Sequence, residues 1–139
     1  MYLIDTNVIS EARKGHRADA GVTAFFQAAI LAETRLYLSV VTVGELRRGV
    51  EIIRRRGDSE QAERLAAWLD VVLADYRENI LPFDLDIAQI WGRLRVPHPE
   101  HALDKQIAAT ALIYDLTVVT RNTPDLAGTG ARLHNPFSG

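Results

Sequence analysis

Short apolar segments of strand length alternate with longer segments of helical spacing along this chain of 139 residues. Parallel strands must be joined by a crossover of a dozen or more residues, usually a helix. The alternation therefore predicts an α/β domain with a mainly parallel central sheet that is flanked by helices on both faces. The expected strands are residues 2–4, 36–38, 80–83, 117–120 and, more weakly, 131–134.

Apolar residues recur at helical spacing between these strands, over residues 19–33, 42–56, 59–76, 84–94 and 101–114. Gly57 and Asp58 interrupt the pattern, which predicts a helical hairpin at about residues 42–77. Pro82 cannot donate a hydrogen bond to a strand ladder, so we expect the third strand at an edge of the sheet. A chain of this length fits one domain, here residues 1–139.

The composition limits the kinds of site that this domain can carry. There is no cysteine, so a metal would bind through oxygen or imidazole rather than thiolate. The formal net charge of −2 differs from that of a strongly basic nucleic-acid-binding domain, so any nucleic-acid contact depends on where the cations lie. Since the sequence has neither a basic leader followed by an apolar run nor an apolar stretch of about 20 residues, we expect a cytoplasmic protein without a membrane span.

Four carboxylates fall where such a sheet would bring them together. Asp5 follows the first expected strand, Glu45 lies shortly after the second, and Asp125 follows the fourth. Asp104 lies in the first turn of the helix that leads back into the fourth strand, which places it at the same edge. Ligands of open α/β sheets bind beyond the carboxyl ends of the strands. We therefore expect these four acids to meet in one pocket.

Carboxylates gathered in one pocket repel each other unless a positive charge lies among them. Hard oxygen ligands favour Mg²⁺ or Mn²⁺ over softer metals, and Mg²⁺ keeps several of its waters. A bound divalent ion can lower the pKa of a water nucleophile and stabilise the charge that develops on a phosphodiester. The residue types thus point to a metal-dependent phosphodiester hydrolase.

Each acid also has an ordinary structural explanation. Asp5 can cap a helix that begins at Thr6. Glu45 fits a capping box with Thr42, and Asp125 lies among turn-forming residues. Asp104 can complement a helix dipole, but it shares a face with apolar residues that should be buried, which favours a functional role.

Other polar residues are assigned to the site or left out of it by their position. Asp84 and Asp86 are explained by the start of a helix, and Asp115 precedes a strand and so lies at the opposite edge. The four histidines show no paired helical spacing of a metal site, so we expect them to be solvated or to pack in the core. The candidates for contacts with substrate phosphates are Arg13, Lys14, Arg93, Arg95, Lys105 and Arg121.

Five short segments contain these acids or follow them in order. They are Leu3-Ile4-Asp5-Thr6-Asn7, Ser39–Gly49 with Gly44-Glu45-Leu46, Leu103-Asp104 with Ile107–Ala111, Val119-Thr120-Arg121-Asn122 with Asp125, and Asn135-Pro136-Phe137. Together they resemble the motifs of PIN-domain ribonucleases, and in particular VapC-type toxins of the FitB-like branch. The resemblance spans nearly the whole chain. It implies that Asp5, Glu45, Asp104 and Asp125 form an acidic quartet around Mg²⁺ or Mn²⁺, with Asn7, Thr120 and Asn122 in support.

One departure from the family pattern concerns the fourth acid. Pro124 and Leu126 flank Asp125 where the family often has a charged residue and an aromatic one. We therefore expect Asp5, Glu45 and Asp104 to form the core of the site, and the distance of Asp125 from the metal is left open. Glu45 and Asp125 can each reach the metal either directly or through water.

The resemblance also implies a function and partners. The function is that of an endoribonuclease that acts as the toxin of a type II toxin–antitoxin pair and cleaves an RNA such as tRNA or rRNA. The partners are a cognate antitoxin and a second copy of the chain, so the protein would form a homodimer or a hetero-oligomer with the antitoxin. Two alternatives stay open. One is a non-catalytic PIN-like module for dimerisation or antitoxin binding, and the other is a small Mg²⁺-dependent phosphatase suggested by Asp84-Leu85-Asp86.

Overall fold

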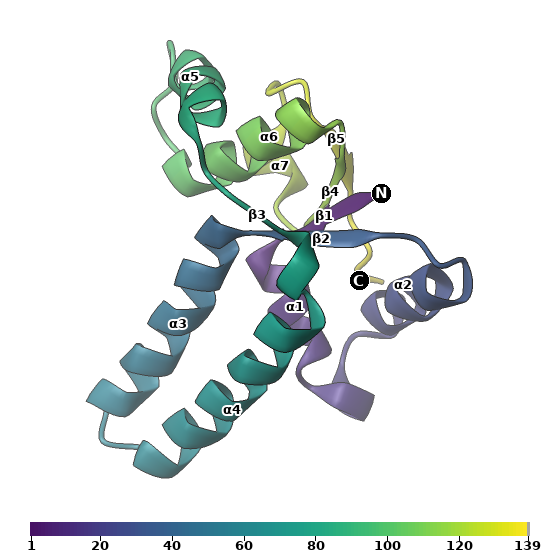
Figure 1. Ribbon diagram of the computed structural model, residues 1–139, viewed down its shortest axis with the longest axis vertical. Coiled ribbons are helices and arrows are strands. Elements are labelled where there is room, and N and C mark those ends of the chain that lie inside the picture. The colour runs from purple at the N-terminus through teal and green to yellow at the C-terminus, as the bar shows by residue number, and fades with distance from the viewer. Residues whose placement is uncertain (139) are drawn as a thin grey trace.

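A five-stranded sheet forms the centre of the protein in a computed structural model that describes residues 1–138. The strand order is β3-β2-β1-β4-β5, and every neighbouring pair is parallel (Figure 1). The predicted α/β class and parallel sheet are therefore confirmed. The strands are β1 (Tyr2–Ile4), β2 (Leu36–Ser39), β3 (Ile80–Leu81), β4 (Thr117–Val119) and β5 (Arg132–His134).

The third strand lies at the edge of the sheet, as predicted, and the first strand lies at its centre. In β1, Tyr2 pairs with Leu36 on one side and Thr117 on the other, so the first strand of the sequence is the middle of the sheet. Strand β3 lies at the edge and ends at Leu81, directly before Pro82. The edge position is confirmed, but the strand is shorter than residues 80–83 because Pro82 cannot continue the ladder.

The helices fill the segments between the strands. Helices α3 and α4 form the predicted hairpin and lie side by side, extending away from the sheet (Figure 1). Helix α1 has only seven residues, and the sequence indicated it only through the helix cap that Asp5 can form. The helices are α1 (Thr6–Ala12), α2 (Ala20–Leu31), α3 (Val40–Arg55), α4 (Ser59–Asp75), α5 (Leu85–Leu94), α6 (Ala102–Tyr114) and α7 (Thr123–Leu126), with 3-10 turns at Gly15–Arg17 and Arg77–Asn79.

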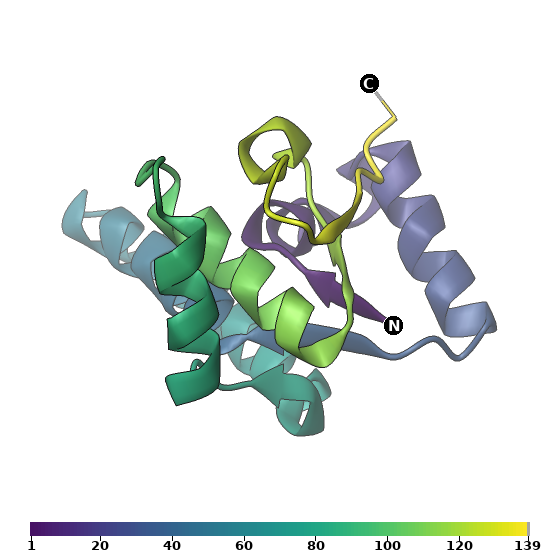
Figure 2. The same ribbon diagram turned by 90° about the horizontal axis from the view of Figure 1, so that it is seen from above.

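Alternation along the strands divides the core between the two faces of the sheet. Ile4 and Val119 contribute to one cluster, which includes buried residues of α1, α2, α3 and α4. Their neighbours Leu3 and Val118 contribute to the other, with buried residues of α6 and α7. Figure 2 shows helices on both sides of the sheet, as predicted. Within residues 1–138, none of the helices combines the length and apolar character that a membrane span requires.

The C-terminal segment is held against the start of α2. Asp19 caps this helix by accepting a hydrogen bond from the Gly21 amide at 2.8 Å. The same carboxylate accepts bonds from the backbone amide and the hydroxyl of Ser138, at 3.0 and 2.9 Å. A Cβ atom at Gly21 would lie 2.1 Å from the carbonyl oxygen of Pro136. Only glycine therefore lets the two backbones approach this closely.

We expect Gly21→Ala to lower the free energy of unfolding by about 1–3 kcal/mol, because the new methyl group forces the C-terminal segment away. Urea unfolding measures the change. Gly49→Ala in α3 is the matched control, since its Cβ would have nothing within 4 Å. This control should be stabilised by about 0.5–1 kcal/mol through helix propensity. Equal stability of both variants would contradict the close approach at Gly21.

Candidate functional site

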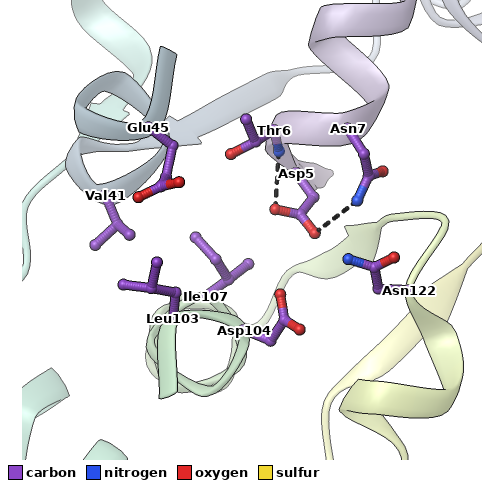
Figure 3. Close-up of a pocket in the computed structure, with 9 residues that line it drawn as sticks. All are labelled: Asp5, Thr6, Asn7, Val41, Glu45, Leu103, Asp104, Ile107 and Asn122. Atoms are coloured by element: carbon purple, nitrogen blue, oxygen red, sulfur yellow. Dashed lines mark hydrogen bonds between the residues drawn. The ribbon is translucent and has the colours of Figure 1, made fainter. Parts of the chain in front are cut away.

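Asp5 is buried at the junction of β1 and α1, with 4% of its surface exposed. Its Oδ1 accepts a hydrogen bond from the Thr6 amide at 2.8 Å and so caps α1. Its Oδ2 accepts bonds from the Thr120 hydroxyl at 2.8 Å and from Nδ2 of Asn7 at 3.3 Å. The helix cap considered as an alternative for Asp5 is present, and the carboxylate faces a cavity at the same time (Figure 3).

Thr120 and Asn7 hold this carboxylate in place, and Asn122 in turn donates a hydrogen bond to Thr120. Thr120 follows β4 and is fully buried. Its hydroxyl donates to Asp5 and accepts a hydrogen bond from the backbone amide of Asn122 at 2.9 Å. Asn7 donates to Asp5, and its Oδ1 accepts a bond from the Arg121 amide at 3.0 Å. The end of β1 and the end of β4 are thereby joined through side chains at the carboxyl edge of the sheet.

A cavity of about 270 Å³ opens beside Asp5. The side chains of Asp5, Glu45 and Asp104 reach it from β1–α1, α3 and α6 and point toward one another (Figure 3). Within residues 1–138, its lining includes no lysine or arginine. The lining residues are Asp5, Thr6, Asn7, Val41, Glu45, Leu103, Asp104, Ile107 and Asn122. Three of the four predicted acids therefore meet in one cavity.

Glu45 is free to reach the cavity because it does not take part in capping α3. The capping box with Thr42 that the sequence offered as an alternative is wrong. Helix α3 begins at Val40 rather than Thr42, and Ser39 is its cap, with the hydroxyl accepting a bond from the Val41 amide at 3.0 Å. Thr42 is fully buried within the helix. Glu45 consequently lies beyond the first turn, where its carboxylate is not needed for capping and is directed into the cavity.

Asp125 lies next to this cavity rather than in it. It sits in the first turn of α7 and lines a neighbouring cavity of about 340 Å³. Its Oδ1 is 3.6 Å from Nε2 of His101. Carboxylate oxygens of Asp104 and Asp125 and a ring nitrogen of His101 all lie within 4.8 Å of one another. The expectation of a single four-acid pocket is thus corrected to three acids in one cavity, with the fourth beyond Asp104.

His101 is the residue at this site that the sequence interpretation missed. It was expected to be merely solvated or to pack in the core, yet it places its imidazole beside two of the predicted acids. Its position three residues before Asp104 was an available signal, because residues at this spacing lie on the same side of a helix. That signal was weakened because His101 precedes α6 and has left-handed backbone geometry, with φ of 58°.

Burial and mutual repulsion both act on the carboxylates of this site. Burial raises the pKa of Asp5 above its ordinary value, and the hydrogen bonds from Thr120, Thr6 and Asn7 only partly oppose it. The pKa of Asp104 is raised too, first by burial and then by the negative charges of Asp5 and Asp125. Both groups therefore bind protons more readily in the folded state than in the unfolded state.

These shifts predict a pH dependence of stability in the absence of metal. Because the folded-state pKa values of Asp5 and Asp104 are raised, their contribution to stability is complete below the unfolded values near 4 and is lost as the pH rises through the folded values. In EDTA, we expect wild type to lose stability relative to an Asp5→Asn, Asp104→Asn double variant as the pH rises from about 4 to 7. Urea unfolding of both proteins gives this difference. A constant difference across the range would contradict the prediction.

The predicted phosphate-binding cations are distributed unequally around the site. Arg13 lines a cavity of about 180 Å³ that shares Thr6 and Glu45 with the acidic cavity. Arg121 follows Thr120, and its guanidinium lies 4.4 Å from the centre of the Phe137 ring. Lys14 is engaged by Glu11 in an ion pair of 2.9 Å. Arg13 is thus connected to the site through a shared cavity lining, and Arg121 through the bond from its backbone amide to Asn7.

The remaining cations lie on or beside α5 and α6, away from the acidic cavity. Lys105 is 7% exposed and donates a hydrogen bond to the carbonyl oxygen of His98, which corrects its expected role as a phosphate contact. The Lys105 side chain points in a different direction from that of Asp104, because consecutive residues of a helix are rotated by about 100° around its axis. Arg95 lies over the Trp91 ring at 4.9 Å, and Arg93 lines a separate shallow cavity on α5.

The sequence matches the PIN-domain family over residues 2–125, a span that includes all four acids. The chain belongs to the PIN-domain family. This PIN domain is 36% identical over 143 residues to Toxin FitB of Neisseria gonorrhoeae, with 99% of both chains covered. It is 35% identical over 145 residues to VapC ribonuclease Y4jK of Sinorhizobium fredii, with 99% of this chain and 98% of that protein covered.

The same similarity is found among solved structures. The crystal structure of FitAcB from Neisseria gonorrhoeae superposes with a TM-score of 0.84 at 35% identity and covers 98% of both chains. The structure of FitAB bound to the IR36 DNA fragment gives a TM-score of 0.72 at 33% identity, with 98% of this chain and 95% of that chain covered. The resemblance to PIN domains read from the sequence motifs is therefore confirmed.

Proposed function

We propose that this PIN domain is a metal-dependent endoribonuclease and the toxin of a toxin–antitoxin pair. One observation carries the proposal, which is the convergence of Asp5, Glu45 and Asp104 in a cavity whose lining has no lysine or arginine within residues 1–138. Relatives named as a toxin and as a VapC ribonuclease support the assignment. The substrate is RNA, and Mg²⁺ or Mn²⁺ is the cofactor.

The donor set fits such an ion. The cavity offers carboxylate oxygens from three acids, all of them hard ligands. A carboxylate has about four acceptor positions. Three hydrogen bonds reach Asp5, from Thr6, Thr120 and Asn7, so an acceptor position of Asp5 is left for a cation. Asp5, Glu45 and Asp104 would hold the ion, with Asp125 reaching it through Asp104 or water.

The protein contributes charge and orientation. A divalent cation, when bound, stabilises negative charge on the phosphodiester and lowers the pKa of a water nucleophile. Asn7 and Thr120 fix the Asp5 carboxylate through hydrogen bonds, so its orientation is set before substrate binds. Val41, Leu103 and Ile107 form the apolar part of the cavity lining. Arg13 and Arg121 would contact the RNA phosphates on either side.

A cognate antitoxin and a second copy of the chain are the proposed partners. Similar solved structures include a toxin–antitoxin complex from Klebsiella pneumoniae, at 25% identity, and VapBC-5 of Mycobacterium tuberculosis, a member of the VapBC family of toxin–antitoxin systems, at 30% identity. Several large apolar side chains of this chain are exposed near the site and along α6, which supports a protein-binding surface. They are Val40, Leu103, Leu112, Ile113 and Tyr114.

The two alternative functions have less support. Asp84 of the phosphatase motif caps α5, its Oδ1 accepting a bond from the Ile87 amide at 3.0 Å, and neither it nor Asp86 lines the acidic cavity. A purely non-catalytic module would not need the buried hydrogen-bond network around Asp5 or three converging carboxylates, which are costly to maintain.

Induced expression in a bacterial host tests the proposed function. Wild type should arrest growth and generate new RNA ends at a few defined positions, and sequencing of those ends identifies the RNA. Asp104→Asn should leave the RNA intact, because Asp104 is close enough to Asp5 and Asp125 to feel both charges and would hold the ion with Asp5 and Glu45. Growth arrest without new RNA ends would favour the non-catalytic alternative instead.

A further inference from the structure

Asp104 lines the acidic cavity and also lies close to two residues of the second cavity, so it has neighbours of two ligand types. On one side are Asp5 and Glu45, which offer only oxygen. On the other side are Asp125 and His101, both of which line the second cavity, of about 340 Å³. Since the ligand atoms of His101, Asp104 and Asp125 lie within 4.8 Å of one another, this second group combines two carboxylates with one imidazole.

The contact between His101 and Asp125 leaves both side chains available to a ligand. Their nearest atoms, Nε2 and Oδ1, are 3.6 Å apart, which is longer than a hydrogen bond. The two side chains are 46% and 40% exposed, so solvent ions can reach them. Ligand atoms that bind one ion at about 2.1 Å lie up to about 4.2 Å apart, so a small rotation of these side chains suffices to bring all three onto one ion.

We propose that His101 is a metal ligand of this site and makes it prefer first-row transition-metal ions such as Mn²⁺ over Mg²⁺. His101, Asp104 and Asp125 form the second cation position, and Asp104 is shared with the oxygen-lined position. This inference rests on the proposed function, because that function places a divalent ion at Asp104. It adds a ligand and a selectivity that the acidic residues alone do not provide.

The chemical reason is the difference between oxygen and imidazole ligands. Mg²⁺ is small and hard, keeps several waters and is bound mainly through carboxylates. Imidazole nitrogen suits transition metals, whose affinity for such ligands rises from Mn²⁺ onward along the first row. A position with one imidazole and two carboxylates therefore discriminates between the two classes of ion, whereas a position built only from oxygen does so weakly.

A neighbouring histidine provides a matched control. His98 lies in the same loop, is 76% exposed and has its Nδ1 3.4 Å from Glu100, so it forms a similar surface pair. Its side chain is not part of the group with Asp104 and Asp125. Asparagine is the replacement at His101 because it tolerates the left-handed backbone there and is favoured at the start of a helix. The same replacement is made at His98 so that the two variants match.

The test uses Mn²⁺ as the probe with the full-length chain. Pulsed electron paramagnetic resonance detects an imidazole nitrogen bound to Mn²⁺, and titration calorimetry gives the affinities for Mn²⁺ and Mg²⁺. We expect the nitrogen signal in wild type and in His98→Asn and its loss in His101→Asn. The preference for Mn²⁺ over Mg²⁺ should fall roughly tenfold in His101→Asn only. Circular dichroism verifies folding, and His101→Gln replaces His101→Asn if the latter is unfolded.

The outcomes separate this inference from the proposed function. Binding of Mn²⁺ to wild type without an imidazole nitrogen signal would overturn the role of His101 and leave the oxygen-lined position intact. The same conclusion holds if His98→Asn and His101→Asn lose the preference equally. If wild type binds neither ion, the proposed metal-dependent function fails together with the inference.

Discussion

The variant Asp5→Asn is expected to cleave RNA roughly a hundredfold to a thousandfold more slowly than wild type, since several kcal/mol of transition-state stabilisation depend on the ion that this carboxylate would hold. Asp5 is the most deeply buried of the four acids and the one whose orientation is most strongly fixed, through Thr6, Asn7 and Thr120. Cleavage of a labelled RNA by purified protein measures the effect.

Loss of activity in this variant should not result from unfolding. Burial raises the pKa of Asp5, so its ionised form is disfavoured in the folded protein, and a neutral side chain of similar size removes this cost. Asparagine retains an oxygen that can accept the bond from the Thr6 amide. In EDTA at neutral pH, we expect Asp5→Asn to be at least as stable as wild type in urea unfolding.

Asp115→Asn is the matched control for the charge change. Asp115 lies at the opposite edge of the sheet, between α6 and β4, with its side chain 84% exposed and paired with Arg132 at 2.8 Å. Its φ of 55° is one that asparagine accepts readily. This variant should cleave RNA as wild type does. Equal activity of wild type and Asp5→Asn would exclude Asp5 from the site.

The parts of this site that the sequence predicted are those fixed by topology. Asp5 follows a strand in the middle of a parallel sheet, and Asp104 begins a helix that returns to the neighbouring strand, so both must lie at the carboxyl edge. Asp104 also shares a helix with a buried apolar stripe, which made its inward position readable from spacing alone. These inferences require only the order of strands and helices.

The parts that the sequence could not predict depend on where individual helices begin and how they rotate. The true start of α3 at Val40 was hidden because two valines are unusual at a helix start, and this shift made the capping box at Glu45 look plausible. Lys105 turned out to be buried because the loop containing His98 covers it. The proximity of His101 to Asp125 arises from contacts between α6 and α7, which no local pattern records.

Removal of divalent cations is expected to abolish RNA cleavage, and addition of Mn²⁺ or Mg²⁺ should restore it. The reason is the unbalanced charge at the site, where the pKa of Asp104 is raised by Asp5 and Asp125 in addition to burial. An ion that relieves this repulsion in the folded state alone must also stabilise that state, by about 2.7 kcal/mol at a concentration one hundred times its dissociation constant. Activity and thermal unfolding should therefore respond to the same range of metal concentration. The Asp5→Asn, Asp104→Asn double variant should show neither response. Full cleavage by wild type in EDTA, or equal stabilisation of the double variant by Mn²⁺, would contradict a metal site at these carboxylates.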